Sequence, residues 1–165
     1  MQKQVVSNST PLIFLAKIGK LDLLERIFSK VYISDAVFNE VIIKGKEKGY
    51  SDAFLVEKFV EKGTILKKNV KIEKLNNIPI GKGELETIEL AIKINVEDIL
   101  IDDSKGRKFA RLYGLQPKGT LWVLTKAFEE YLISKEDLKN NITELVKSGF
   151  RIKEDLLIEI LKDLI

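Results

Sequence analysis

The sequence predicts an α/β protein in which a mainly parallel central sheet lies between layers of helices. Three observations lead to this expectation. Short apolar segments recur along the 165 residues, and segments with apolar residues at helical spacing lie between them. Glycine, proline or small polar residues separate the two kinds of segment. Strands that alternate with helices are typical of parallel sheets, because every parallel connection has to cross back over the sheet.

The first half of the chain contains three predicted strands. Val5-Val6 forms a short buried strand. Thr10 is expected to cap the next helix, with Pro11 at the first helical position, where the missing N–H costs nothing. The remaining elements of this half are helices over 12–16 and 21–28, a strand over 30–33, a helix over 36–46 capped by Ser34 or Asp35, a helix over 51–61, and a strand or strand end over 64–66.

The second half begins with a loop around 76–79 and the turn Gly81-Lys82-Gly83. The stretch GELETIELAIKI then carries apolar residues at helical spacing and predicts a helix. The later elements are a strand over 99–101, a basic helix over 104–113 ended by a left-handed Gly114, a last strand at 115–116, a helix capped by Thr120, a helix from Ser134 to about 149, and an amphipathic tail over 154–165. Trp122 and Phe128 are expected in the core.

The composition fits one globular domain and excludes several kinds of site. Apolar residues make up 45% and charged residues 32% of the chain. The absence of Cys and His excludes disulfides, thiolate zinc sites and histidine-based catalysis. Any catalytic metal would need oxygen ligands, which favours Mg²⁺ or Mn²⁺. A net charge of +3 is too small to indicate nucleic-acid binding by itself. With no long apolar run and no leader, a cytoplasmic protein is expected, and the Lys, Glu and Ile content weakly suggests a thermophile.

Polar residues follow the predicted strands, at the edge where ligands bind in parallel sheets. They come from four segments of the chain: Asn8, Glu40, Glu84 and Glu86, and Asp102 and Asp103. Carboxylates brought close together repel one another, and a divalent cation between them removes that repulsion. Each residue also has a purely structural alternative. Glu40 can be a solvated helix residue, Glu84 can favour the helix dipole, Asp103 can cap its helix, and Asn8 can bond its own turn.

Five stretches of the chain, in this order, resemble one protein family: VVSNSTPLIFLAKIGKLDLL, VYISDAVFNEVI, GKGELETIELA, ILIDDSKGRKFARLYGL and GTLWVL. They cover most of residues 5–125, and the tail GFRIKEDLLIEIL also fits. The resemblance is to the DUF3368 branch of prokaryotic PIN-like proteins, within a family of metal-dependent nucleases that includes toxin ribonucleases. It implies a three-layer α/β/α fold, with residues 1–165 as one PIN-like domain and helices 134–165 as an appended part.

The resemblance also implies a site that binds Mg²⁺ or Mn²⁺ and cleaves RNA. Its acidic positions fall on Asn8, Glu40, Glu86 (with Glu84 a close competitor) and Asp103 (less probable, Asp102), and Thr10 matches the hydroxyl residue that supports the first position. Asn8 departs from the stricter pattern because it carries no charge. Members of this branch carry either Asp or Asn there, so no engineered change is assumed.

Three functional interpretations stay open on the sequence. The first is a metal-dependent ribonuclease, the toxin of a toxin–antitoxin pair, with RNA as substrate and a small antitoxin as partner. The second is a catalytically weak or inactive module that binds RNA or protein, because Asn8 lacks a charge. The third is an oligomeric scaffold or homodimer, in which the tail stripe Leu157, Ile160, Leu161 and Leu164 packs on another subunit instead of on its own core. The cations Lys105, Arg107, Lys108, Arg111 and Lys82 are candidates for RNA phosphates or, equally, for a solvated surface.

Overall fold

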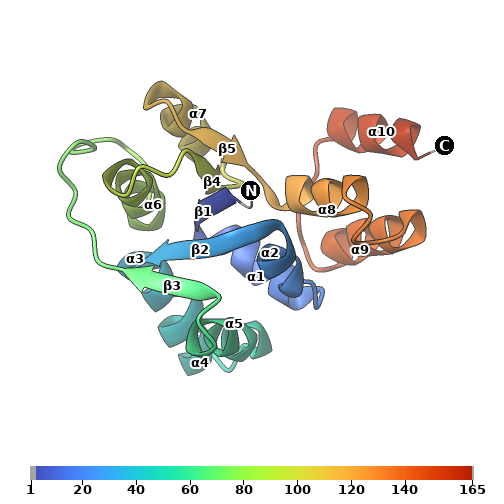
Figure 1. The fold of residues 1–165 in the computed structure, drawn as a ribbon, viewed down its shortest axis with the longest axis horizontal. Helices are drawn as coiled ribbons and strands as arrows, with labels where there is room; N and C mark the ends of the chain where they lie inside the picture. The colour runs from blue at the N-terminus through green and yellow to red at the C-terminus, as the bar shows by residue number, and fades with distance from the viewer. Residues whose placement is uncertain (1–2, 165) are drawn as a thin grey trace.

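The computed structural model describes residues 3–164, which form a five-stranded, all-parallel sheet with helices on both faces (Figure 1). The strands are β1 (Lys3–Ser7), β2 (Phe28–Ser34), β3 (Ile65–Lys68), β4 (Asp98–Leu100) and β5 (Gln116–Lys118). Their order in the sheet is β3-β2-β1-β4-β5. This arrangement confirms the predicted three-layer α/β/α fold.

The helices alternate with the strands along most of the chain. They are α1 (Ser9–Lys17), α2 (Asp22–Ile27), α3 (Asp35–Phe38), the π-helical segment η1 (Asn39–Ile43), α4 (Lys44–Glu47), α5 (Ser51–Glu61), α6 (Lys82–Lys93), α7 (Ser104–Leu112), α8 (Thr120–Glu129), α9 (Lys135–Lys147) and α10 (Glu154–Asp163). None of the helices within residues 3–164 is long and apolar enough to cross a membrane.

The central strand β1 lies at the point where the direction of the sheet's growth reverses. From β1 the chain first adds β2 and β3 on one side, and it then crosses back to add β4 and β5 on the other. Val6 pairs with Tyr32 of β2 and also with Ile99 of β4. In parallel sheets, a ligand crevice opens at the carboxyl end of the strands at such a reversal. The residues after β1 therefore occupy the position where a site is expected.

Each face of the sheet has its own apolar core. Val5 and Leu100 belong to the core shared with α1, α2, α5 and α8, whereas Val6 and Ile99 belong to the core shared with α6 and α7. All four side chains are fully buried. A strand covered on both faces has no polar alternation, which explains why the predicted strands are short and continuously apolar.

The C-terminal helices pack on the first of these cores. A capping box starts α9, in which Ser134 and Asp137 each accept a hydrogen bond from the other's backbone N–H. Ile160 of α10 and Leu164 directly after it are buried in the core, whereas Leu161 is 42% exposed. Most of the predicted tail stripe thus faces the chain's own core. Ile165, the predicted end of this helix, lies outside the described residues.

Two predicted helix caps are wrong, and two, Ser34 and Ser134, are confirmed. Asn8, not Thr10, is at the N-cap of α1, so Pro11 is the third helical residue instead of the first. The helix begins at Ser9, directly after the extended backbone of Asn8, whose N–H still pairs with the sheet. Thr120 is the first residue of α8 and gives its hydroxyl hydrogen to Asp102 instead of capping the helix. Ser34 caps α3 as predicted, and accepts a hydrogen bond from the backbone N–H of Val37.

Candidate active site

Asn8 lies where β1 ends and α1 begins, at the carboxyl edge of the sheet. Its backbone N–H donates to the carbonyl oxygen of Leu100 in β4, at 2.8 Å, and this bond fixes the turn. The side chain is only 2% exposed, and its Nδ2 donates to Oε1 of Glu84 at 3.1 Å. Its Oδ1 is buried without a hydrogen-bond partner among the described residues. A buried carbonyl oxygen of this kind normally has a partner, so it marks a place for a donor, a water or a cation.

Glu40 approaches the same place from η1. This segment inserts a π-type turn into the predicted helix, and such turns recur at functional sites. A Cβ placed on Gly83 would lie 3.2 Å from Oε2 of Glu40 and also 3.2 Å from Oδ1 of Asn8. The hydroxyl of Ser9, which is buried and unpartnered among the described residues, would lie 3.9 Å from it. The three oxygens therefore converge on the space left open by the missing side chain of Gly83.

The structure gives the two glutamates at the start of α6 different surroundings. Glu84 is in the first turn, where its carboxylate folds back over Gly81 and meets Asn8. Glu86 is buried on a different side of the helix, where its Oε2 accepts from the backbone N–H of Ala36 at 2.7 Å. Residues two positions apart on a helix point in widely different directions. Of the two, Glu84 is therefore the one that contacts Asn8.

The two aspartates after β4 are both engaged elsewhere. Asp103 caps α7 and accepts from the backbone N–H of Gly106 at 2.7 Å. Asp102 accepts from Thr120 twice, from the backbone N–H at 2.7 Å and from the hydroxyl at 2.6 Å. Burial raises the pKa of Asp102 above its ordinary value, although the bonds from Thr120 and the charge of Arg107 act against this. Asp102 thus ties the end of β4 to the start of α8.

The donor atoms around Gly83 suit a hard, hydrated cation. Within residues 3–164, no three acidic side chains form a group that could hold a metal by themselves. The cluster of Asn8, Ser9, Glu40 and Glu84 offers two carboxylates, one amide oxygen and one hydroxyl. Mg²⁺ is typically held by one or two carboxylates and keeps several water molecules. The unpartnered oxygens of Asn8 and Ser9 add neutral ligands, so the cluster fits such an ion.

Basic residues flank this edge of the sheet. Lys105, Lys108 and Arg111 are exposed on α7, and Lys82 is exposed at the first position of α6. Arg107 is partly buried, and its Nη1 donates to the carbonyl oxygen of Ile101 at 3.1 Å. Lys82 and Lys105 are nearest to the carboxyl edge of the sheet, because they stand at the starts of α6 and α7, whereas Lys108 and Arg111 lie further along α7.

Sequence reasoning missed two members of the cluster, Ser9 and Gly83. Thr10 was expected to supply the supporting hydroxyl, but it is partly exposed, and the buried hydroxyl belongs to Ser9 one position earlier. For Gly83 the sequence does carry a signal, because a glycine directly before Glu84 allows other groups to approach the backbone closely.

Comparison with known proteins agrees with the fold. A PilT N-terminus domain protein from the hyperthermophilic archaeon Sulfolobus solfataricus is similar in structure, with a TM-score of 0.54, 14% identity, and coverage of 76% of this chain and 94% of that one. A domain of a functionally unknown protein from Methanocaldococcus jannaschii has a TM-score of 0.46 at 17% identity, with coverage of 71% and 90%, which is too distant to support an argument. No curated protein matches the chain.

The comparison with protein families is more direct. The DUF3368 family, described as a PIN domain, matches residues 4–165. PIN domains are in general nuclease-like and usually use divalent metal ions. The match covers nearly the whole chain and includes every residue of the cluster around Gly83. The chain therefore belongs to the DUF3368 family of PIN domains.

Proposed function

We propose that the chain is a ribonuclease that depends on Mg²⁺ or Mn²⁺ and hydrolyses RNA phosphodiesters at the cluster around Gly83. The observation that carries the proposal is the buried, unpartnered Oδ1 of Asn8, which faces the Oε2 of Glu40 across the space above Gly83. Neutral and acidic oxygens meet there at the carboxyl edge of a parallel sheet, in a family that is generally nuclease-like.

The side chains of the cluster would have separate roles in the reaction. Glu40, Glu84 and the Oδ1 of Asn8 would hold the cation, which when bound would acidify water and neutralise charge on the scissile phosphate. The amide of Asn8 donates to Oε1 of Glu84, and this hydrogen bond would orient the carboxylate toward the cluster. Lys82 and Lys105, at the starts of α6 and α7, would attract the RNA backbone. Asp103 accepts a hydrogen bond from the backbone N–H of Gly106 and caps α7, so we assign it a structural role at the start of that helix.

A cleavage assay on a fluorescent RNA tests this function. We expect cleavage that requires added Mg²⁺ or Mn²⁺ and falls by about 100-fold or more in Glu40→Gln, because a cation ligand is lost. Glu47→Gln is the matched control, since Glu47 is exposed on the neighbouring helix α4, and it should cleave like the wild type. Cleavage that continues in excess EDTA, or that is equal in the two variants, contradicts the proposal.

A module that binds RNA or a protein without cutting RNA is the second candidate. It is favoured by the neutral amide of Asn8, which leaves two carboxylates, Glu40 and Glu84, in the cluster. Retention of labelled RNA without any cleavage, at millimolar Mg²⁺ or Mn²⁺, would select this candidate. The toxin role, the antitoxin partner and the homodimer are predictions of the family resemblance. Light scattering on the purified chain tests the homodimer, and co-purification with the product of an adjacent small gene tests the antitoxin.

A further inference from the structure

A groove of about 640 Å³ lies between α7, α8 and the C-terminal segment that leads into α10. Its lining includes Asp102 and Gly119, which follow β4 and β5 at the carboxyl edge of the sheet. Phe150 and Trp122 contribute aromatic surface to its walls. The groove thus opens on the same edge of the sheet as the cluster around Gly83.

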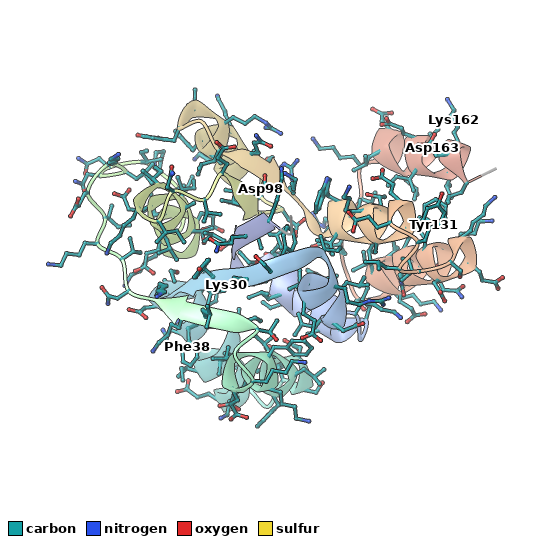
Figure 2. All side chains as sticks on the ribbon, viewed as in Figure 1. Lys30, Phe38, Asp98, Tyr131, Lys162 and Asp163 are labelled. Carbon is teal, nitrogen blue, oxygen red and sulfur yellow. The ribbon has the colours of Figure 1, made fainter. Side chains whose placement is uncertain are left out.

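The charges along this groove are separated. Arg107 and Arg111 lie one helical turn apart on α7, and Arg151 and Lys153 lie on the segment just before α10. Of the acidic lining residues, Asp102 is at the end next to the sheet, where Thr120 donates to both of its oxygens. The other three are placed further along the helices: Glu129 at the end of α8, and Glu159 and Asp163 in the later part of α10. Both helices start near α7 and β5 and run away from them (Figure 1), and Asp163 is at the far end of α10 (Figure 2). The cationic end of the groove is therefore the end next to the sheet.

Arg107 is held in place with most of its donors free. Its Nη1 donates to the carbonyl of Ile101, and a Cβ on Gly119 would lie 3.2 Å from the same nitrogen. Among residues 3–164 Arg107 forms no salt bridge within 4 Å, although Asp102, whose oxygens accept from Thr120, lies near enough for its charge to act on the pKa of Arg107. Burial and the nearby charge of Arg111 lower the pKa of Arg107. Two crowded guanidinium groups, neither in a salt bridge with a carboxylate of the described residues, suit an external anion such as phosphate, whose geometry matches the arginine donors.

We propose that this groove holds a single strand of RNA next to the scissile phosphate, with backbone phosphates between Arg107 and Arg111 on one wall and Arg151 and Lys153 on the other. The inference rests on the proposed ribonuclease function, and it defines the path of the substrate. A groove of this size accepts one strand, whose unstacked bases can pack on aromatic side chains such as Phe150. The C-terminal segment is then part of the substrate site.

The experiment measures RNA affinity in the absence of divalent cations. Fluorescence anisotropy of a labelled single-stranded RNA is recorded with the full chain in EDTA over a range of salt concentrations. The variant Arg151→Gln/Lys153→Gln should bind about tenfold more weakly at low salt. The slope of log K against log salt should fall by about 1.4, because each phosphate contact to a single strand contributes about 0.7. The control Lys147→Gln/Lys162→Gln removes the same charge from exposed positions on α9 and α10 that do not line the groove, and Figure 2 shows Lys162 at the far end of α10.

The outcomes separate this inference from the function on which it rests. A smaller slope in Arg151→Gln/Lys153→Gln, with a control like the wild type, supports the groove even if no cleavage is found. Equal effects of the two double variants, an unchanged slope, or no RNA binding by the wild type overturns it, including the case in which the wild type cleaves RNA. Glu40→Gln provides the converse comparison, because it should lose cleavage without weakening RNA binding.

Discussion

The amide of Asn8 determines how the candidate site behaves without a cation. Asn8→Asp replaces the donor to Glu84, at 3.1 Å, with a second carboxylate. At an effective dielectric constant of about 20, two like charges about 4 Å apart repel by about 4 kcal/mol. The two carboxyls therefore cannot both ionise freely, and the pair keeps one proton, which restores an O–H···O bond.

The sign and size of the effect on stability follow from this proton. The repulsion raises the pKa of the introduced carboxyl in the folded chain above its value of about 3.9 in the unfolded chain. Asn8→Asp is therefore most stable below a pH of about 3.9, and it loses stability as the pH rises through the pKa of the folded state. Each pH unit in that interval costs about 1.4 kcal/mol, and the repulsion limits the total at pH 7 to about 2–4 kcal/mol. For a chain of this size, each kcal/mol lowers Tm by about 2–4 °C, so we expect a fall of about 4–16 °C.

Thermal unfolding followed by fluorescence checks this prediction. In EDTA, Asn8→Asp should be close to the wild type at low pH and much less stable at pH 7. Mg²⁺ or Mn²⁺ should then raise its Tm more than that of the wild type, because the cation replaces the shared proton. Asn141→Asp is the matched control, since Asn141 is also buried, has an unpartnered Nδ2 among the described residues, and lies on α9. Equal rescue of both variants by the cation, or a wild-type Tm for Asn8→Asp at pH 7 in EDTA, refutes the reasoning.

Three further changes test other parts of the structure. Gly83→Ala should keep or slightly raise the stability of the chain, because alanine favours a helix by about 1 kcal/mol relative to glycine. Its Cβ would lie 3.2 Å from Oδ1 of Asn8 and Oε2 of Glu40, so the rise in Tm caused by the cation should become smaller. An unchanged rise in Tm would mean that the cation binds elsewhere. Asp102→Asn should become more stable relative to the wild type as the pH rises from 3.8, because burial raises the pKa of Asp102 and folding therefore favours its protonated form. The hydroxyl of Thr120 can accept a hydrogen bond from the new amide. Urea unfolding measures the difference in stability, and a difference that does not change with pH contradicts this prediction. Ser34→Ala should lower the free energy of unfolding by about 1 kcal/mol, because the backbone N–H of Val37 loses its cap, and urea unfolding measures it.

The fold was predictable because its signals are local. Strands buried on both faces appear as short apolar runs, and Val5-Val6 and Ile99 lie in such runs. Ser34 and Ser134 cap the helices that their sequence context indicated. The boundaries were less accurate, since β2 starts at Phe28, before the predicted 30–33. The first of the extra residues, Phe28, pairs with Lys3 at the start of β1, and no local pattern reports such pairing.

The site was predictable only to the level of segments. The sequence placed Asn8, Glu40 and the start of α6 at one edge of the sheet, and the structure brings these three together. The choice between Glu84 and Glu86 depends on the rotation of α6 about its axis, which is set by packing against the sheet and by the N-terminus of α3. Such rotation is a tertiary property, so neighbouring carboxylates on a helix cannot be ranked from spacing alone.

The sheet order has a consequence for synthesis on the ribosome. β1 and β2 are synthesised early and can pair with each other. The other edge of β1 has no partner strand until β4, which ends at Leu100, has been synthesised. Until then the backbone groups after Val6 stay unpaired, as at any open strand edge. Glu84 likewise joins Asn8 only when α6 has been made. A growing chain therefore carries no assembled site, and the central strand needs protection from other chains until more than half of the protein has been translated.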